Sequence, residues 1–144
     1  YGLDFSKTKG HLIRAAMEGV AYSLRHNLDV AESLGAKAEV LRSMGGSANS
    51  LVWTQIKSDI TGKPIEVPAS DTATSLGTAL LAGVGVGLYE DFDRAVAETV
   101  EIKREHRPNP GRKAAYEANY RVYLELYENL KDMMSRGGVL PWRQ

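Results

Sequence analysis

The sequence predicts an α/β fold in which a few short strands alternate with longer helices. Apolar residues recur at spacings of three and four through several long segments, which is the helical period. Short apolar segments bounded by glycine and proline lie between them, as strands in alternating α/β units do. The chain has 144 residues, 43% of them hydrophobic, and no cysteine. A chain of this length can bury a core as one domain without disulfides.

Charge and composition narrow the classes of function. Lys and Arg number 18, as do Asp and Glu. This balance argues against nucleic acid or an anionic membrane as the main partner, because either would favour a basic excess. Without cysteine there is no thiol nucleophile and no Cys-ligated metal, and we expect a cytoplasmic protein. His11, His26 and His106 are scattered, so we predict no metal site and assign them to the surface or to helix packing.

The first half of the chain reads as helix, strand, turn and helix. Apolar positions from Ile13 to Leu28 predict a long amphipathic helix over residues 9–34, which Ser6 or Thr8 can cap. A short strand is expected over residues 39–44, followed by a turn over 45–50. Helical spacing then resumes over residues 51–61 and stops at Gly62, Lys63 and Pro64.

The second half adds two short strands and three helices. Residues 65–67 predict a strand, and residues 73–86 a helix whose glycines suggest close approach to a neighbouring backbone. Asp91 can cap a brief helix that ends near Thr99, and Val100 with Ile102 can form an edge strand. After Pro108-Asn109-Pro110-Gly111, tyrosines at spacings of three and four predict a long final helix: Tyr116, Tyr120, Tyr123 and Tyr127. Two or three strands are few for an independent sheet, so we expect part of the domain to lie upstream.

One motif points to ligand chemistry. Gly45 and Gly46 follow a predicted strand and precede a helix. Glycines allow a ligand to approach the backbone closely, and ligands of open α/β sheets bind beyond the carboxyl ends of strands. The pair matches neither a Walker loop nor the Gly-x-Gly-x-x-Gly fingerprint, so a tight turn without a ligand is the alternative interpretation.

Other polar and aromatic residues have structural interpretations. Asp59 and Glu18 fit solvated helix faces, because no partner for general-base chemistry accompanies them. The tyrosine stripe fits helix packing. Trp53 fits an anchor of the second helix in the core, with stacking on adenine as the alternative.

Four blocks of sequence, in order, resemble the C-terminal domain of FGGY-family carbohydrate kinases, with xylulose kinases the most similar. The blocks cover residues 14–25, 45–56, 58–65 and 75–83. The resemblance extends from about Leu3 to Met134. Residues 1–134 would form the C-terminal portion of the kinase, its second actin-like ATPase domain. Residues 135–144 are an unassigned tail.

The resemblance implies an actin-like ATPase (ribonuclease H-like) fold of two related domains, here a helix-rich part with a few short strands. ATP with Mg²⁺ would bind in the cleft between the domains, and the sugar mainly on the N-terminal one. The adenosine motif of the family falls on Gly45, Gly46, Ser47, Asn49 and Ser50, with Ser47 where many members have a third glycine.

The resemblance also implies what lies elsewhere. The general-base aspartate of the family is expected upstream, so no catalytic residue and no metal ligand is assigned here. Asp71 stands where relatives often have Glu, and we interpret it as structural.

We therefore hypothesise that the chain is the C-terminal, adenosine-side part of an ATP-dependent kinase that phosphorylates a pentulose such as xylulose. Its partners would be the N-terminal domain of the same kinase, which brings the sugar, and in a homodimer a second copy. We expect this portion alone to be inactive. The alternatives are a kinase of another sugar or polyol (ribulose, gluconate or glycerol type), a non-catalytic nucleotide- or sugar-binding module, and a helical module that docks a partner through its tyrosines.

Overall fold

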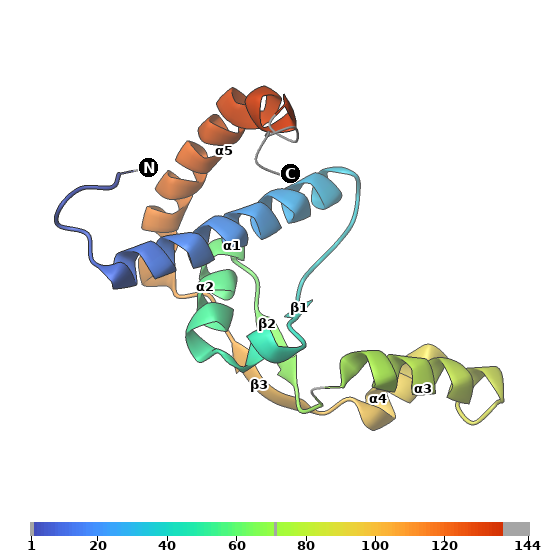
Figure 1. The fold of residues 1–144 in the computed structure, drawn as a ribbon. Coiled ribbons are helices and arrows are strands. Elements are labelled where there is room, and N and C mark those ends of the chain that lie inside the picture. The colour runs from blue at the N-terminus through green and yellow to red at the C-terminus, as the bar shows by residue number, and fades with distance from the viewer. Residues whose placement is uncertain (1, 71, 137–144) are drawn as a thin grey trace, which may run out of the picture.

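The computed structural model describes residues 2–70 and 72–136. Its helices and strands alternate along much of the chain (Figure 1), and the helices predominate. The predicted helix-rich α/β arrangement is therefore confirmed. The elements in chain order are α1 (Lys9–Ser33), β1 (Leu41–Arg42), the 3-10 helix η1 (Gly46–Asn49), α2 (Leu51–Thr61), β2 (Ile65–Pro68), α3 (Ala73–Gly85), α4 (Phe92–Thr99), β3 (Ile102–His106), the 3-10 helix η2 (Pro110–Arg112) and α5 (Lys113–Arg136).

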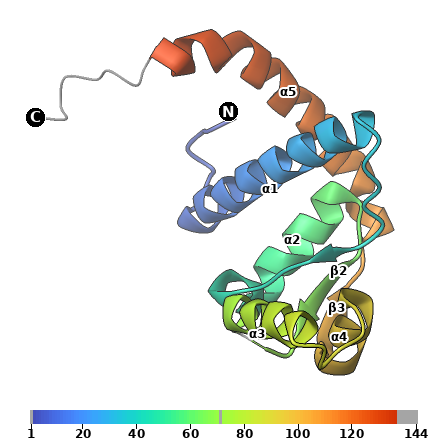
Figure 2. The same cartoon turned by 90° about the vertical axis from the view of Figure 1, so that its right-hand side faces the viewer.

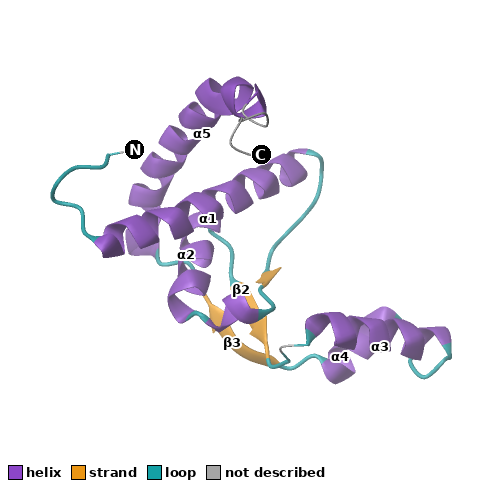
Figure 3. Cartoon of the chain, in the orientation of Figure 1, coloured by secondary structure: helices purple, strands orange, loops and turns teal. Residues whose placement is uncertain are grey.

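The described strands form one small sheet in the order β1-β2-β3 (Figure 3). β1 and β2 are parallel and α2 connects them, so β1-α2-β2 is a βαβ unit. β3 runs antiparallel to β2, with Ile65 opposite His106 and an irregularity at Val67 and Pro68. The strand expected over residues 39–44 is shorter than predicted, since only Leu41 and Arg42 pair with β2. The register places the end of β3 beside the start of β2.

The core is built by three helices, of which α2 lies on the sheet. α1 and α5 pack together and onto α2 (Figure 2). Tyrosine rings fill much of the contact: Tyr22 of α1 stacks on Tyr120 and Tyr123 of α5, with ring centroids 6.0 and 5.8 Å apart. The packing role predicted for the tyrosine stripe is confirmed for Tyr116 and Tyr120, which are buried in this core together with Ala21, Tyr22, Ile56 and Ile60.

α3 and α4 form an arm that leaves the end of β2 and returns to the start of β3 (Figures 1 and 3). The two helices lie against each other, with Leu80 and Ala95 buried. A Cβ at Gly83 would lie 2.9 Å from the ring of Tyr89, so the close neighbour expected at the glycines is an aromatic side chain and not a backbone. Outside this contact, Leu81 of α3 and the C-cap residue Val86 are exposed.

Candidate functional site

The predicted glycine turn lies where β1 ends and α2 begins. Gly45 has φ +79° and ψ −179°, a backbone conformation that residues with a Cβ rarely adopt. Residues 46–49 then form the single 3-10 turn η1. Five predicted site residues thus belong to one short loop: Gly45, Gly46, Ser47, Asn49 and Ser50.

Hydrogen bonds from two neighbouring elements fix this loop. Ser50 is the N-cap of α2, and its Oγ accepts the backbone N–H of Trp53 at 3.2 Å. The hydroxyl of Thr54 donates to the carbonyl oxygens of Ser50 and Ala48 at 3.0 and 3.3 Å. The guanidinium of Arg104, on β3, also donates to the Ala48 carbonyl. Both α2 and β3 therefore set the conformation of the turn.

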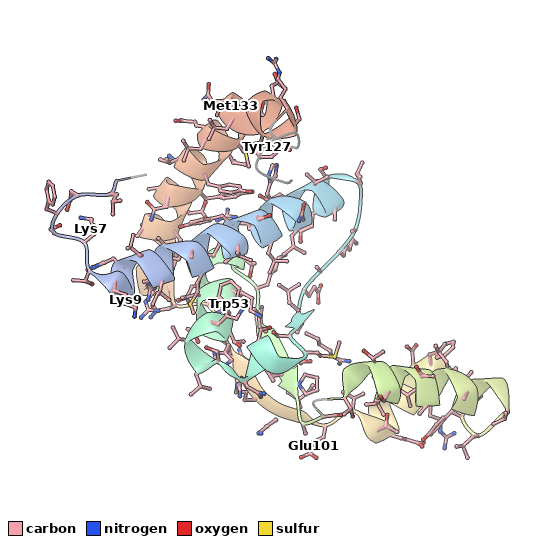
Figure 4. All side chains as sticks on the ribbon, in the orientation of Figure 1. Lys7, Lys9, Trp53, Glu101, Tyr127 and Met133 are labelled. Carbon is pink, nitrogen blue, oxygen red and sulfur yellow. The ribbon has the colours of Figure 1, made fainter. Side chains whose placement is uncertain are left out.

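The outer side of the loop is open. Gly46, Ser47 and Asn49 are exposed, whereas Ala48 is buried against α2 and β3. A shallow cavity of about 340 Å³ adjoins the loop and lies between it, α1 and α2. Apolar groups make up most of its wall, and Trp53 sits on α2 on the side toward α1 (Figure 4). The lining residues are Ala16, Met17, Val20, Ser47, Ser50 and Trp53.

A lysine lies next to the carboxyl end of β1. The Nζ of Lys57 donates to Ser43 Oγ at 2.6 Å and lies 5.4 Å from the centre of the Trp53 ring. Burial lowers the pKa of Lys57. The site thus has one ammonium beside it and the Arg104 guanidinium on the Ala48 carbonyl, whereas the side chains of the loop itself are neutral hydroxyls and an amide.

This arrangement can be compared with known proteins. The model of the FGGY family of carbohydrate kinases, C-terminal domain, matches residues 1–86. The chain belongs to the FGGY family of carbohydrate kinases. An autoinducer-2 kinase of Yersinia pestis (strain Pestoides F) is 44% identical over 130 residues, and that of Yersinia enterocolitica is 39% identical over 130 residues. Each alignment covers 90% of this chain but only 24% and 25% of the respective relative.

Solved structures place this FGGY domain in the actin-like ATPase fold. The xylulose kinase from Rhodospirillum rubrum superposes with a TM-score of 0.81 at 30% identity, over 92% of this chain and 27% of that one. The fold predicted from the resemblance is therefore confirmed. The chain spans about a quarter of the length of the curated relatives it matches.

The interpretation of Asp59 as a residue of a solvated helix face is wrong for this FGGY domain. The side chain of Asp59 is fully buried instead of solvated. It accepts Gln55 Nε2 at 2.7 Å, the Asn109 backbone N–H at 2.8 Å and Arg112 Nη1 at 3.0 Å. His106 is also buried, between α2 and its own strand, which agrees with the helix-packing alternative predicted for the histidines. Asp59 is a clamp between α2 and the loop before α5.

Glu18 likewise lies on a helix face that is only partly solvated. It accepts Arg14 Nε at 2.8 Å and the Tyr116 hydroxyl at 3.2 Å, so it links α1 to α5. His26 packs edge-on against Tyr127, with centroids 5.0 Å apart, which confirms its helix-packing role. The structural role predicted for Asp71 falls outside the described residues.

Trp53 packs against the core and also borders the cavity, so its predicted anchoring role is confirmed. Among residues 2–70 and 72–136, no group of three His, Asp or Glu side chains could hold a metal ion. No helix in that part of the chain is long and apolar enough to span a bilayer.

Sequence reasoning missed the residues that hold the turn from behind. Thr54 follows Ser50 by four positions, one helical turn, so its contact with the Ser50 carbonyl was available from periodicity. Arg104 carried no such signal, because it is 56 positions from Ala48 and reaches it only through the antiparallel register of β2 and β3.

Proposed function

We propose that this FGGY domain supplies the adenosine side of the ATP site in a sugar kinase. The observation that carries the proposal is the Gly45–Ser50 loop, which presents open backbone at the carboxyl end of β1. In α/β proteins this is the usual position of a ligand. ATP would be the phosphoryl donor.

The chemistry of the loop favours the nucleoside over the phosphates. Ser47 and Asn49 offer neutral donors and acceptors, which suit ribose hydroxyls and the edges of a base. The adjoining cavity is mainly apolar and includes Trp53, as expected beside an aromatic base. A triphosphate would instead call for several cations or a longer series of free amides.

The rest of the reaction would take place outside this domain. Phosphoryl transfer requires an oriented nucleophile and Mg²⁺ at the β- and γ-phosphates. We assign these to the N-terminal domain of the same kinase, which would bring the general base and hold the sugar. In this scheme residues 1–134 are the second domain of the kinase and residues 135–144 a tail. The kinase would act in the cytoplasm, as a monomer or a homodimer.

The similarities suggest two kinds of phosphoryl acceptor. Identities of 39% and 44% to autoinducer-2 kinases favour autoinducer-2. The 30% identity to a xylulose kinase keeps a pentulose such as xylulose as the second candidate. Since the sugar would bind mainly to the N-terminal domain, an activity assay must distinguish the two candidate acceptors.

Nucleotide affinity tests the site. In the kinase that carries this domain, Gly46→Asp adds bulk and negative charge to the exposed backbone of the loop. Isothermal titration should show at least roughly tenfold weaker ATP binding. Gly10→Asp, which adds the same charge at the first turn of α1, is the matched control and should bind ATP like the wild type. Unchanged ATP affinity in Gly46→Asp would remove the site assignment.

Turnover tests the activity and the acceptor. ADP release should depend on a sugar or sugar-like acceptor, and autoinducer-2 and xylulose are supplied separately. Turnover with autoinducer-2 alone favours the first candidate and turnover with xylulose alone favours the second. ATP binding without turnover on any acceptor, ribulose, gluconate and glycerol included, would indicate the non-catalytic module instead.

A further inference from the structure

Alternate residues of β3 place two polar side chains behind the loop of residues 45–50, which we call the nucleotide loop because of its proposed ligand. Arg104 and His106 lie two positions apart and so share the face that is turned toward α2 and η1. One guanidinium nitrogen of Arg104 donates to the Ala48 carbonyl, and its Nε donates to His106 Nε2 at 3.1 Å. Arg104 thus joins the loop to the imidazole of His106.

The neighbours of His106 determine its protonation state. The Nδ1 of His106 lies 3.0 Å from Gln55 Oε1. The amide nitrogen of Gln55 donates elsewhere, to Asp59 at 2.7 Å and to the Arg107 carbonyl at 2.8 Å, which fixes the amide orientation. Nδ1 must therefore carry the proton that Gln55 Oε1 accepts, and Nε2 must accept from Arg104. Only the neutral imidazole satisfies both contacts.

The far end of this series of hydrogen bonds is rigid. Asp59, which accepts from Gln55, is fully buried. It also holds the backbone of Asn109 and the guanidinium of Arg112, at the start of the segment that leads into α5. Arg104 is therefore held in place by groups that are themselves fixed on α2 and before α5.

We propose that Arg104 is a positioning residue for the nucleotide, held by His106 and Gln55 so that it fixes the Ala48 carbonyl and with it the loop that contacts adenosine. The inference rests on the proposed function, because it needs a nucleotide at the loop. Arg104 acts through the backbone of the loop. Without it, Thr54 is left as the side chain that holds this carbonyl among the described residues.

The arrangement should respond to acid. Protonation turns Nε2 of His106 from an acceptor into a donor and sets two cations side by side. Burial is the largest cause that lowers the pKa of His106, and the positive charge of Arg104 is the second. The charge of Lys57 also lowers this pKa, whereas that of Asp59 raises it. Arg104 on β3, and Lys57 and Asp59 on α2, are the charged groups that act on the imidazole. The imidazole therefore stays neutral as the pH falls below 6.5, the ordinary pKa of histidine, and gains a proton only at its lowered pKa. At that pH the loop loses the support of Arg104.

The test uses the kinase that carries this domain. Arg104→Met removes the donor and keeps much of the apolar bulk. A hydrogen bond from a charged donor typically contributes a factor of ten or more, so the Kd for ATP should rise roughly tenfold. The kcat at saturating ATP and the KM for the phosphoryl acceptor should stay close to wild type. Arg107→Met is the matched control, because that side chain is exposed and pairs only with Glu105 among the described carboxylates.

A second variant separates positioning from folding. In His106→Gln, the new amide can accept from Arg104 and donate to Gln55 without titrating. Its ATP affinity should match wild type near neutral pH and stay constant into mildly acidic buffer, where the wild type weakens. If Arg104→Met fails to fold, the pH dependence of ATP affinity in wild type and His106→Gln tests the proposal instead. Parallel pH profiles of these two proteins would overturn it.

The outcomes also distinguish this inference from the proposed function. An Arg104→Met enzyme that binds ATP within about twofold of the Arg107→Met control would overturn the inference, provided that Gly46→Asp still weakens binding. If Gly46→Asp also leaves ATP binding unchanged, the nucleotide assignment itself fails, and the inference fails with it.

Discussion

Gly45 and Gly46 are adjacent and chemically identical, yet their backbones differ. Gly45 lies at φ +79°, while Gly46 has no positive φ and open space where a Cβ would be. Gly45→Ala should lower the free energy of unfolding by roughly 1–3 kcal/mol, because the residue is forced into a conformation nearly restricted to glycine. Gly46→Ala should stay within about 0.5 kcal/mol of wild type. Urea unfolding of both variants measures the difference, and equal losses would contradict this account of the turn.

Asp59 is the carboxylate on which α2, η2 and the loop before α5 converge. Asp59→Ala removes an acceptor from three donors and leaves the Asn109 N–H without its partner. We expect a loss of about 3 kcal/mol in the free energy of unfolding, since buried groups left unpaired are costly. Glu101→Ala, at an exposed carboxylate, should change it by less than about 0.5 kcal/mol. Similar losses in the two variants would show that the clamp contributes little.

At the scale of elements, the contact between α1 and α5 contains two tyrosines with opposite polar environments. The Tyr120 hydroxyl donates to Asp29 at 2.6 Å. Burial is the largest cause that raises the pKa of Tyr120, and this hydrogen bond is the second. The Tyr22 hydroxyl is buried without a hydrogen-bond partner among the described residues. Burial raises the pKa of Tyr22 to about 12, although the nearby Asn119 amide acts against the rise.

Replacing each tyrosine with phenylalanine should therefore have different effects. Tyr120→Phe loses a hydrogen bond to a charged group and should destabilise the protein by about 1–2 kcal/mol. Tyr22→Phe removes an unsatisfied buried hydroxyl and should leave stability unchanged or raise it by up to about 1 kcal/mol. Thermal unfolding compares them, and a larger loss for Tyr22→Phe would mean that its hydroxyl has a partner after all.

The elements that sequence predicts best are those whose signal is local. α2 ends at Thr61 as expected, because the apolar period stops there and Gly62 takes a left-handed conformation at the C-cap. The strand expected over residues 39–44 shrinks to two residues, because its length depends on how far β2 runs beside it. The backbone hydrogen bonds of a helix form within the same segment, whereas a strand pairs with a segment that can be distant in the sequence.

The same distinction separates the parts of the candidate site. Gly45 and Gly46 could be found from a strand, a glycine pair and a helix in sequence. Asp59 could not be interpreted correctly, because its partner Asn109 lies 50 positions away. The β2–β3 register decides both this contact and that of Arg104 with Ala48, and no spacing in the sequence specifies that register.

At the scale of the whole molecule, the lowered pKa values of His106 and Glu117 make stability depend on pH in the acidic range. His106 has a lowered pKa in the folded state, so the unfolded chain takes up its proton first as pH falls below 6.5. Stability should decline from there until the folded pKa is passed. Glu117 has its pKa lowered chiefly by a hydrogen bond from Arg25, so its contribution is present above 4.5 and is lost as pH falls further.

Urea midpoints measured from neutral to acidic pH should therefore fall in two windows. His106→Gln should remove the contribution of this residue to the upper window and keep the lower one. Glu117→Gln should do the reverse. A wild-type midpoint that stays constant from neutral pH into the acidic range below 4.5 would contradict both assignments.

The arm of α3 and α4 has a closed base. β2 leads out to it and β3 leads back beside β2, and the Ala69 backbone N–H donates to the Glu101 carbonyl at 2.9 Å (Figure 4 labels Glu101 at this base). Because entry and exit already meet, evolution could lengthen, shorten or replace the arm without disturbing the register of the sheet. The family match ends at residue 86, just after α3, so it includes the 45–50 loop and β2 but neither α4, which returns along the arm, nor β3.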